Sequence, residues 1–435
     1  MKKMLGAILG FGVGLLVGGC GSDTGSRLDK GAGGTAGVSL DAAVDSPLLP
    51  DAPYTIPDTI AFPQPTGPFT IVRGQRRTLI DPTRDLEGNV LAVDAGASDG
   101  GNTEAGSTRP LSAEIWYPSD SPGSGATVPY MDSAETAGFF LAAQRVLPNS
   151  QLAAYSPEVL NHVRTHSYAS LPFANSLTIA PVLLFSPGYN ALPRAYTAFI
   201  EEAVSWGYIV VAISHTLYTP VTTFADGSTI GMTHSGDDMS DPGVYFTAAV
   251  WLADARFVLD QLVKTASLDP YGEIEGHVDL TKVGMFGHSF GGSTSIGMLV
   301  TDDRVMAAIN LDGSIYRSWP AQPFSNPVLI LQEPGVDSSV NNVFNQAAGR
   351  AFLAVLANSL HLNFSDMGII AAAIQLDPSL WSSNLLGTID PVRAVQEVNG
   401  YVEAFFDSTL KGMSSPLLEG PTAQYPDIVD FSKKP

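Results

Sequence analysis

The chain has 435 residues and is strongly acidic, with 43 acidic against 22 basic residues and a formal net charge of −21 at pH 7. This charge excludes nucleic acid as a partner and excludes electrostatic adhesion to anionic membranes. The length beyond residue 60 suits a single α/β domain with insertions.

The amino terminus is typical of a bacterial lipoprotein signal. Met1-Lys2-Lys3 precedes the uncharged stretch 4–19, which is too short and too rich in glycine for a membrane span. Cys20, the only cysteine of the chain, ends a Val-Gly-Gly-Cys sequence that resembles a lipobox. We expect cleavage after residue 19 and diacylation of Cys20, so that two acyl chains anchor the protein in the bacterial cell envelope. Gly21 follows the cysteine where an aspartate would direct retention at the inner membrane, so resemblance to enterobacterial sorting rules favours the outer membrane.

Two segments have compositions that cannot bury enough apolar surface to fold. Residues 20–60 are mostly Gly, Ala, Ser, Asp and Pro, which predicts a flexible tether ahead of a folded domain over 61–435. Residues 93–108 are similar and are predicted to form a surface insertion between two strands.

Apolar runs and periodicity predict the remaining elements. Strands are expected at 70–73, 111–117, 180–185, 208–214, 282–287, 305–311 and 327–332. Helices are expected at 193–206, 246–266, 290–300, 345–357 and 396–410. The alternation from residue 180 onward predicts an α/β fold with a mostly parallel, doubly wound sheet and helices on both faces. Residues 130–175 are expected to form a cap, and the apolar run Met367–Ile374 is expected to form either a rim of the site or a core helix.

The sequence Gly-His-Ser-Phe-Gly-Gly at 287–292 lies between a predicted strand and a predicted helix. In this setting G-x-S-x-G is the nucleophile elbow of an α/β-hydrolase. Glycines flank Ser289 because the strained turn leaves no room for a Cβ on either side. The motif therefore predicts an α/β-hydrolase fold in which Ser289 is the nucleophile.

A serine nucleophile needs a base, and in this fold the chain order is serine, acid, histidine. Of the seven histidines, only His361 follows the elbow, because the other six precede Ser289. The residues alone leave the acid open. Asp312 follows one predicted buried strand, while Glu333 and Asp337 follow the next, and ligand sites collect at the carboxyl ends of such strands.

The chain resembles the platelet-activating factor acetylhydrolase family, of the secreted and lipoprotein-associated type. The segments that carry the resemblance are GHSFGG at 287–292, Leu-Asp-Gly at 311–313 and HLNFSD at 361–366. Further matching stretches, over about residues 65 to 412, are 109–118, 206–210 and 405–407. The resemblance implies a triad of Ser289, Asp312 and His361, and so favours Asp312 over the two later acids.

One loop departs from that family. Where the family has His-Gly-x-Gly, this chain has Ser-Pro-Gly-Tyr-Asn at 186–190, which is similar to the corresponding loop of bacterial cutinases and polyester hydrolases. The loop has the same task in both families. The backbone N–H groups of Tyr189 and Phe290 are expected to form the oxyanion hole, so the change affects substrate preference rather than mechanism.

We therefore expect a lipid-anchored serine esterase that acts on short-acyl or truncated-acyl phospholipids, or on small esters generally. No cofactor and no metal is expected, because the acidic segment Asp237–Asp241 lacks EF-hand spacing and is interpreted as a solvated loop. One alternative is a cutin or polyester hydrolase, which the loop at 186–190 favours. The other alternative is a catalytically inactive surface or binding protein with a hydrolase fold. The complete triad argues against this alternative.

Overall fold

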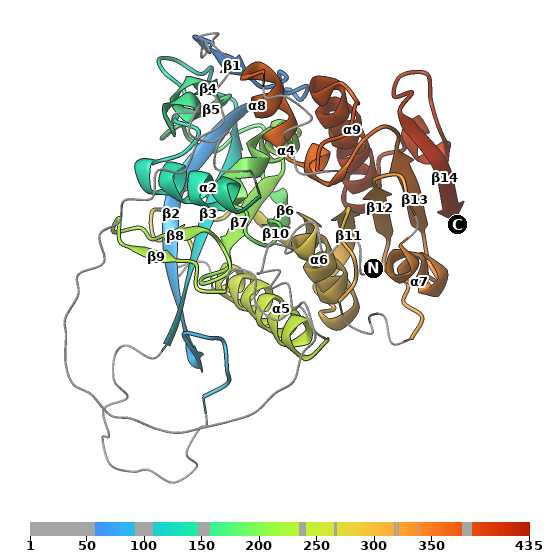
Figure 1. Cartoon of the computed structure of the whole chain (residues 1–435), viewed down its shortest axis with the longest axis horizontal. Helices are drawn as coiled ribbons and strands as arrows, with labels where there is room; N and C mark the ends of the chain where they lie inside the picture. Colours follow the sequence, from blue (N-terminus) through green and yellow to red (C-terminus); the bar gives the residue numbers. More distant parts are fainter. Residues whose placement is uncertain are drawn as a thin grey trace, which may run out of the picture. The chain divides into compact units, whose positions relative to one another are not determined.

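Ten strands form one mixed sheet in the order β14-β13-β12-β11-β10-β6-β7-β3-β2-β5 (Figure 1). The structure is a computed structural model that describes residues 57–91, 108–146, 157–234, 241–264, 268–316, 319, 322–335, 337–375 and 385–435, with the backbone alone at 144–146 and 241–242. All of these residues belong to one compact unit, Thr55–Pro435.

The strands of the main sheet are β2 (Thr70–Asp85), β3 (Thr108–Ser119), β5 (Ser167–Tyr168), β6 (Ala180–Ser186), β7 (Ile209–Ser214), β10 (Val278–His288), β11 (Val305–Leu311), β12 (Val328–Gln332), β13 (Ala351–Leu356) and β14 (Ile428–Lys434). Two small sheets pair β1 (Ile60–Ala61) with β4 (Val163–Arg164), and β8 (Val221–Thr223) with β9 (Thr229–Gly231). The six strands from β7 to β13 in the sheet order are parallel, whereas β3 and β14 run antiparallel to their inner neighbours.

The described α-helices are α2 (Ser133–Val146), α4 (Thr197–Ser205), α5 (Asp241–Val263), α6 (Phe290–Thr301), α7 (Ser338–Gln346), α8 (Met367–Ala373) and α9 (Pro391–Leu410). The 3₁₀ helices among the described residues are η1 (Pro157–His162), η2 (Pro193–Tyr196), η3 (His361–Phe364) and η5 (Pro416–Glu419). Within the described parts of the chain, no helix is long and apolar enough to cross a membrane.

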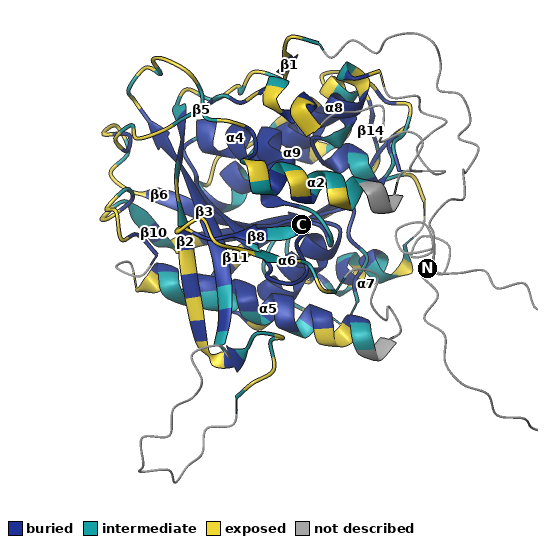
Figure 2. Cartoon of the chain, turned by 60° about the vertical axis from the view of Figure 1, so that its left-hand side comes forward, coloured by how far each residue is buried: buried dark blue, intermediate teal, exposed yellow. Residues whose placement is uncertain are grey.

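Helices cover both faces of the sheet, with α4 and α9 on one face and α5 on the other (Figure 2). Alternate residues of β6 show the two cores. Val182 and Leu184 belong to the core that α5 and α6 cover. On the opposite face Phe185 lies beside Phe286, which in turn packs against Phe406 of α9. Burial on both faces explains why the central strands are continuous apolar runs rather than alternating ones.

The carboxyl ends of the parallel strands lie at one edge of the sheet, because neighbouring parallel strands run in the same direction. The loops that leave β6, β10, β11, β12 and β13 there contain, in order, residues 187–190, Ser289, Asp312, Glu333 and His361. The fold therefore gathers at this edge residues that are up to 174 positions apart (187 to 361). This is the place where open α/β sheets bind ligands.

Most predicted elements are confirmed, with shifts at their ends. The predicted strands correspond to β2, β3, β6, β7, β10, β11 and β12, of which β2 is much longer than predicted. The predicted helix at 193–206 is η2 followed by α4, and those at 246–266, 290–300 and 396–410 are α5, α6 and α9. Helix α9 begins five residues early because Asp390 caps it, its carboxylate accepting from the Arg393 N–H at 2.8 Å.

The predicted helix at 345–357 is wrong. α7 ends at Gln346, and Ala351–Leu356 forms β13, which pairs in parallel with β12. The run Ala-Phe-Leu-Ala-Val-Leu is apolar at every position, so it carries no periodicity that separates a buried strand from a helix. Alanine and leucine favour a helix locally, but pairing with β12 and burial between two layers decide the structure.

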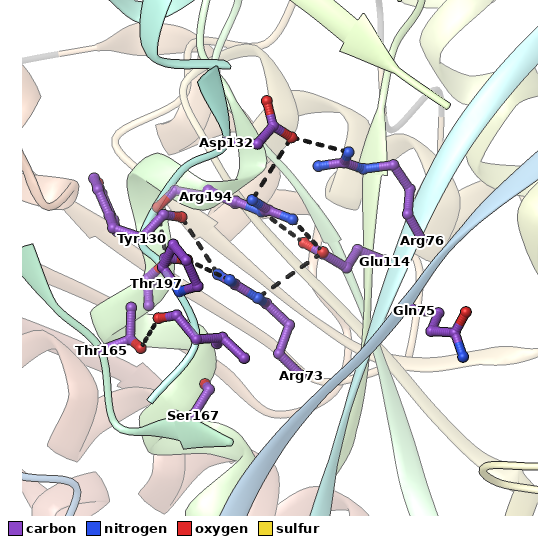
Figure 3. A network of polar contacts seen from close by, with 12 residues as sticks. Arg73, Gln75, Arg76, Glu114, Tyr130, Asp132, Thr165, Ser167, Arg194 and Thr197 are labelled. Atoms are coloured by element: carbon purple, nitrogen blue, oxygen red, sulfur yellow. Dashed lines mark hydrogen bonds and ion pairs between the residues drawn. The ribbon is translucent and has the colours of Figure 1, made fainter. Parts of the chain in front are cut away.

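The predicted cap region 130–175 contains α2, η1, β4 and β5. Buried ion pairs hold its first helical turn, because Arg194 lies 2.6 Å from both Glu135 of α2 and Glu114 of β3. Arg76 of β2 adds a second contact to Glu135 at 2.7 Å. Figure 3 shows Arg194 and Arg73 converging on Glu114 from different elements. The start of α2 is therefore fastened to the sheet.

The apolar run Met367–Ile374 forms α8 and ends one residue beyond it. Ile369, Ile370 and Ala371 are buried. Because α8 packs against α9, η3 and β1, its apolar residues face the protein interior, as expected of a core helix. The predicted insertion at 93–108 lies outside the described residues except for Thr108.

Candidate active site

Ser289 occupies a strained turn between β10 and α6. Its backbone has φ 55° and ψ −119°, a region that non-glycine residues rarely adopt. The turn requires its glycines, since a Cβ on Gly287 would lie 2.5 Å from Gly291 and a Cβ on Gly291 would lie 2.0 Å from the Ser186 carbonyl oxygen. The Ser289 N–H donates to the Leu311 carbonyl at 2.9 Å, which ties the turn to the next strand. These are the features of a nucleophile elbow.

Asp312 and His361 meet at the same edge of the sheet. His361 Nδ1 lies 2.5 Å from Asp312 Oδ2, and both side chains are buried. The other carboxylate oxygen of Asp312 accepts from the Glu333 N–H at 2.9 Å, while the Asp312 N–H donates to the Leu331 carbonyl at 2.7 Å. Asp312 is thus held by β12 on one side and is directed at His361 on the other.

The two other candidate acids have different surroundings. Asp337 caps α7, where its carboxylate accepts from the Ser339 N–H at 2.8 Å and from the Ser314 hydroxyl at 2.5 Å. Glu333 is half-buried near the pair, and burial followed by the charge of Asp312 raises its pKa to about 7. Of the three acids, Asp312 is the one hydrogen-bonded to the His361 ring.

The protonation of His361 depends on opposing effects. Burial lowers the pKa of His361, but the hydrogen bond and charge of Asp312, together with the charge of Glu333, outweigh burial and raise it above its usual value. A carboxylate on Nδ1 requires the proton to be on that nitrogen when the ring is neutral. Nε2 is then the basic nitrogen, and the carboxylate stabilises the imidazolium that forms when Nε2 takes a proton.

The segment 361–366 positions this histidine through its later residues. Asn363 Oδ1 accepts from the Leu360 N–H at 2.8 Å and from the Gly387 N–H at 2.7 Å, which closes the turn η3 around His361. Asp366 binds the first N–H groups of α4 and also accepts from the Tyr130 hydroxyl at 3.0 Å. Burial raises the pKa of Asp366 to about 8. The residues HLNFSD thus join the histidine loop to a helix terminus, a role that the sequence motif did not reveal.

The predicted oxyanion residues flank Ser289. Phe290 is the first residue of α6, and the first N–H groups of a helix have no partner within the helix. Tyr189 belongs to the loop after β6, and Gly188 brings that loop close, since a Cβ there would lie 3.4 Å from Ser289 Cβ. The rings of Tyr189 and Phe290 have centroids 5.9 Å apart. The structure therefore places both residues around Ser289.

Aromatic rings gather next to these two residues. Trp251 of α5 stacks on Tyr189 with centroids 6.4 Å apart and meets Phe290 edge-on at 4.9 Å. Tyr316 stacks on Phe290 at 4.8 Å. Tyr189 and Tyr316 are half-buried, so this aromatic cluster, made of Tyr189, Trp251, Phe290 and Tyr316, is partly open to solvent.

A second Ser–His–Asp arrangement lies nearby. Ser186 Oγ is 2.9 Å from His215 Nε2, and His215 Nδ1 is 3.0 Å from Asp254 Oδ2. Arg109 forms two hydrogen bonds with Asp254, at 2.7 and 2.8 Å. Ser186, His215 and Asp254 are each 0% exposed. By contrast, Ser289 and His361 are each 8% exposed. No substrate can reach these three buried side chains. They instead hold Ser186, the first residue of the loop 186–190 that contains the proposed oxyanion donor Tyr189.

One group of histidine and acidic side chains among the described residues has the spacing of a metal site, namely His288, Asp312 and His361. One nitrogen of each histidine in this group already donates a hydrogen bond. His288 Nε2 donates to the His361 carbonyl at 2.9 Å, and His361 Nδ1 donates to Asp312. A nitrogen that carries a proton does not bind a metal, so a metal ion here would compete with these hydrogen bonds or with the proposed role of His361 Nε2 as the base. Cys20 and residues 237–240 of the acidic segment lie outside the described residues.

Comparisons with known proteins identify esterases that are similar to this chain. The family model described as "Platelet-activating factor acetylhydrolase, isoform II" matches residues 260–413, which include Ser289, Asp312 and His361. A "Probable 1-alkyl-2-acetylglycerophosphocholine esterase" from Arthroderma benhamiae is 30% identical over 269 residues, or 57% of this chain and 65% of that protein. The platelet-activating factor acetylhydrolase of Cavia porcellus is 24% identical over 261 residues, covering 53% of this chain and 57% of its own.

The chain thus spans less than two thirds of the length of these curated relatives. A solved structure, the ferulic acid esterase from Streptomyces cinnamoneus, superimposes with a TM-score of 0.67 at 29% identity and covers 85% of this chain and 98% of its own. The resemblance and the fold predicted from the sequence are therefore confirmed: this chain is similar to the platelet-activating factor acetylhydrolases and has an α/β-hydrolase fold.

Proposed function

We propose that this chain is a serine hydrolase of carboxylic esters. The observation that carries the proposal is the position of Ser289, on a strained strand-to-helix turn beside the hydrogen-bonded pair of Asp312 and His361. The relatives named as esterases, and the esterase that shares the fold, support the same reaction class. The assignment of roles follows from this geometry and from the family resemblance.

The proposed reaction proceeds through an acyl-enzyme. The Ser289 hydroxyl attacks the ester carbonyl while His361 Nε2 takes its proton and then passes it to the departing alcohol. Asp312 keeps the proton of the neutral ring on Nδ1 and stabilises the imidazolium. The N–H groups of Tyr189 and Phe290 bind the oxyanion, and removal of one oxyanion-hole donor typically costs ~2.7–4 kcal/mol of transition-state stabilisation. Water, activated by His361, then releases the acid and restores Ser289.

The proposed substrates are phospholipids with short or truncated acyl chains. The matching family is described as a platelet-activating factor acetylhydrolase, and the fungal relative carries the name of a 1-alkyl-2-acetylglycerophosphocholine esterase. Hydrolysis is proposed to be independent of calcium, because a histidine base and backbone donors supply the chemistry for which some phospholipases use the ion.

A second candidate is the hydrolysis of bulky aromatic or polymeric esters. The specific observation in its favour is the aromatic cluster of Tyr189, Trp251, Phe290 and Tyr316 beside the proposed oxyanion donors. Rings in offset or edge-on contact are a suitable surface for an aromatic acyl group. The loop at 186–190, which is similar to that of cutinases and polyester hydrolases, points the same way.

An ester panel tests the proposal and separates the candidates. The purified full-length protein, in mild detergent, is assayed on p-nitrophenyl acetate, on a short-acyl and a long-acyl phosphatidylcholine, on a feruloyl ester and on a polyester film. We expect turnover of the acetate and a preference for the short-acyl phospholipid. Higher kcat/KM on the feruloyl ester or release from the film would favour the second candidate. Absence of turnover on every ester would reject a hydrolase and leave a binding protein.

We further propose that the protein is anchored to the bacterial cell envelope through diacylated Cys20. The support is the placement of the only cysteine directly after an uncharged segment preceded by two lysines. Two acyl chains are enough for stable anchoring, whereas one chain gives reversible binding. Such an anchor would keep the enzyme close to lipid or polymer substrates outside the cytoplasm.

A further inference from the structure

His288, the residue before the proposed nucleophile, connects two parts of the site. Its Nε2 lies 2.9 Å from the backbone carbonyl oxygen of His361. Its Nδ1 lies 2.8 Å from the hydroxyl of Tyr196, and that hydroxyl lies 3.1 Å from the N–H of Gly188. A continuous chain of three hydrogen bonds therefore begins at Gly188 in the loop 186–190, here called the oxyanion loop. It runs through Tyr196 and His288 to the backbone of His361, the proposed base.

The direction of each bond follows from the chemistry of its ends. A carbonyl oxygen only accepts, so Nε2 of His288 carries a proton and donates it to His361. In a neutral ring Nδ1 must then accept, and Tyr196 is the donor. The N–H of Gly188 can only donate, so it gives its hydrogen to the Tyr196 oxygen. All three bonds are satisfied by one arrangement of protons, in which His288 is neutral.

The surroundings keep His288 neutral. The residue is buried, and burial followed by the charge of His361 lowers its pKa well below the usual value. The groups facing its ring are Tyr196, Phe364 and His361, and the centroid of the His361 ring is 4.4 Å away. An imidazolium at His361 during the reaction would further disfavour a charge on His288. The titratable neighbours therefore preserve the proton arrangement while the base changes its charge.

We propose that His288 is a positioning residue that couples the oxyanion loop to the catalytic histidine. Gly188 immediately precedes Tyr189, whose N–H is the proposed donor to the oxyanion, so the bond to Tyr196 orients the peptide beside that donor. The bond from His288 to His361 fixes the backbone of the residue that takes the proton. One rigid chain thereby sets the donor and the base relative to each other, on either side of Ser289. This inference rests on the proposed esterase function.

Two substitutions of His288 each retain one of its bonds. Glutamine can place an amide nitrogen near the Nε2 position, which retains the donor to His361 and removes the acceptor for Tyr196. Asparagine can place its oxygen near the Nδ1 position, which retains the acceptor for Tyr196 and removes the donor to His361. Tyr196→Phe removes the hydroxyl and leaves the ring that packs against Phe185.

The full-length protein and its variants are assayed for kcat and KM on a soluble short-acyl ester. We expect His288→Gln and His288→Asn each to lower kcat about tenfold with KM within about twofold, because misplaced catalytic groups slow the chemical step rather than ground-state binding. In the Tyr196→Phe background, which already lacks the bond, His288→Gln should lower kcat by less than about twofold more. Tyr117→Phe is the matched control, since it removes a buried hydroxyl that donates to the Leu171 carbonyl at 2.8 Å outside the site, and its kcat should stay within about twofold of the wild type.

The results that would overturn the inference are distinct from those that would reject the function. Wild-type kcat in both His288 variants, with unchanged circular dichroism, would show that His288 only fills the core. Equal and additive losses for His288→Gln with and without the Tyr196 hydroxyl would show that no coupled chain exists. If the His288 variants do not fold, Tyr196→Phe decides alone: a kcat no lower than that of Tyr117→Phe overturns the proposal. No turnover in the wild type would reject the esterase function itself and the inference with it.

Discussion

Replacement of Asp312 by asparagine tests how the acid controls the base. Asp312 uses both carboxylate oxygens, accepting from His361 Nδ1 at 2.5 Å and from the Glu333 N–H at 2.9 Å. An asparagine has one oxygen. If that oxygen retains the bond to the backbone N–H, the NH₂ group faces His361 Nδ1, which must then accept. The ring proton moves to Nε2, and this nitrogen can no longer take the proton of Ser289.

We therefore expect Asp312→Asn to lower kcat on the order of 10⁴-fold, equivalent to ~5.4 kcal/mol of transition-state stabilisation, with an unchanged fold. The measurement is steady-state hydrolysis of a p-nitrophenyl ester, with a thermal melt of each variant. Two matched variants remove the other candidate acids. Asp337→Asn retains an oxygen to cap α7, and we expect kcat within about twofold of the wild type.

Glu333→Gln should change the pH profile more than the rate. The charge of Glu333 contributes to the raised pKa of His361, so its removal lowers that pKa. More of the base is then neutral at a given acidic pH, and the acidic limb of the kcat profile should move to lower pH, with the alkaline plateau within about threefold of the wild type. A larger loss in Glu333→Gln or Asp337→Asn than in Asp312→Asn would place the acid after β12 and refute the reasoning.

The other predictions concern the nucleophile, the anchor, metal dependence and the buried ion pairs. Ser289→Ala should abolish turnover apart from the small acceleration that oxyanion binding retains, and ester hydrolysis at more than a trace of the wild-type rate would contradict the assignment. Cys20→Ser should move the expressed protein from the detergent phase to the aqueous phase in a partition assay. Equal partitioning of the wild type and the variant would contradict the proposed lipid anchor. Dialysis against a strong chelator should leave the hydrolysis of a soluble ester unchanged, whereas a loss that calcium restores would implicate the segment Asp237–Asp241. Arg194→Ala removes the guanidinium that pairs with buried Glu114 and Glu135, and it should lower the free energy of unfolding, measured in urea, by about 3–5 kcal/mol. A decrease below about 1 kcal/mol would show that Arg73 and Arg76 are enough to neutralise the two carboxylates.

Some features of this protein follow from local sequence because the signals that predict them are local. The elbow is predictable because its residues form one short G-x-S-x-G motif, although Gly291 is required by a contact with Ser186 of the distant strand β6. The central strands are predictable because burial on both faces demands continuous apolar runs. The choice of His361 needs only the chain order of the fold. These signals do not depend on knowing which distant segments meet.

Other features depend on contacts between segments far apart in the chain. The run at 351–356 has no periodicity of its own, so pairing with β12 makes it a strand. Ser186, His215 and Asp254 have the chemistry of a triad, and only their complete burial shows that they cannot meet a substrate.

The residues around Ser289, Asp312 and His361 show the same division. The residues alone left three acids open, and the hydrogen bond between Asp312 and His361 depends on the order of β11 and β12 in the sheet. His288 could be recognised from the sequence only as a neighbour of the nucleophile. Its position between Tyr196 and the His361 backbone arises when three loops converge at the carboxyl edge of the sheet. Local sequence thus determined the strained turn and the choice of His361 as the proposed base, whereas tertiary structure decided which polar groups meet, because distance and burial are set by the packing of the whole sheet.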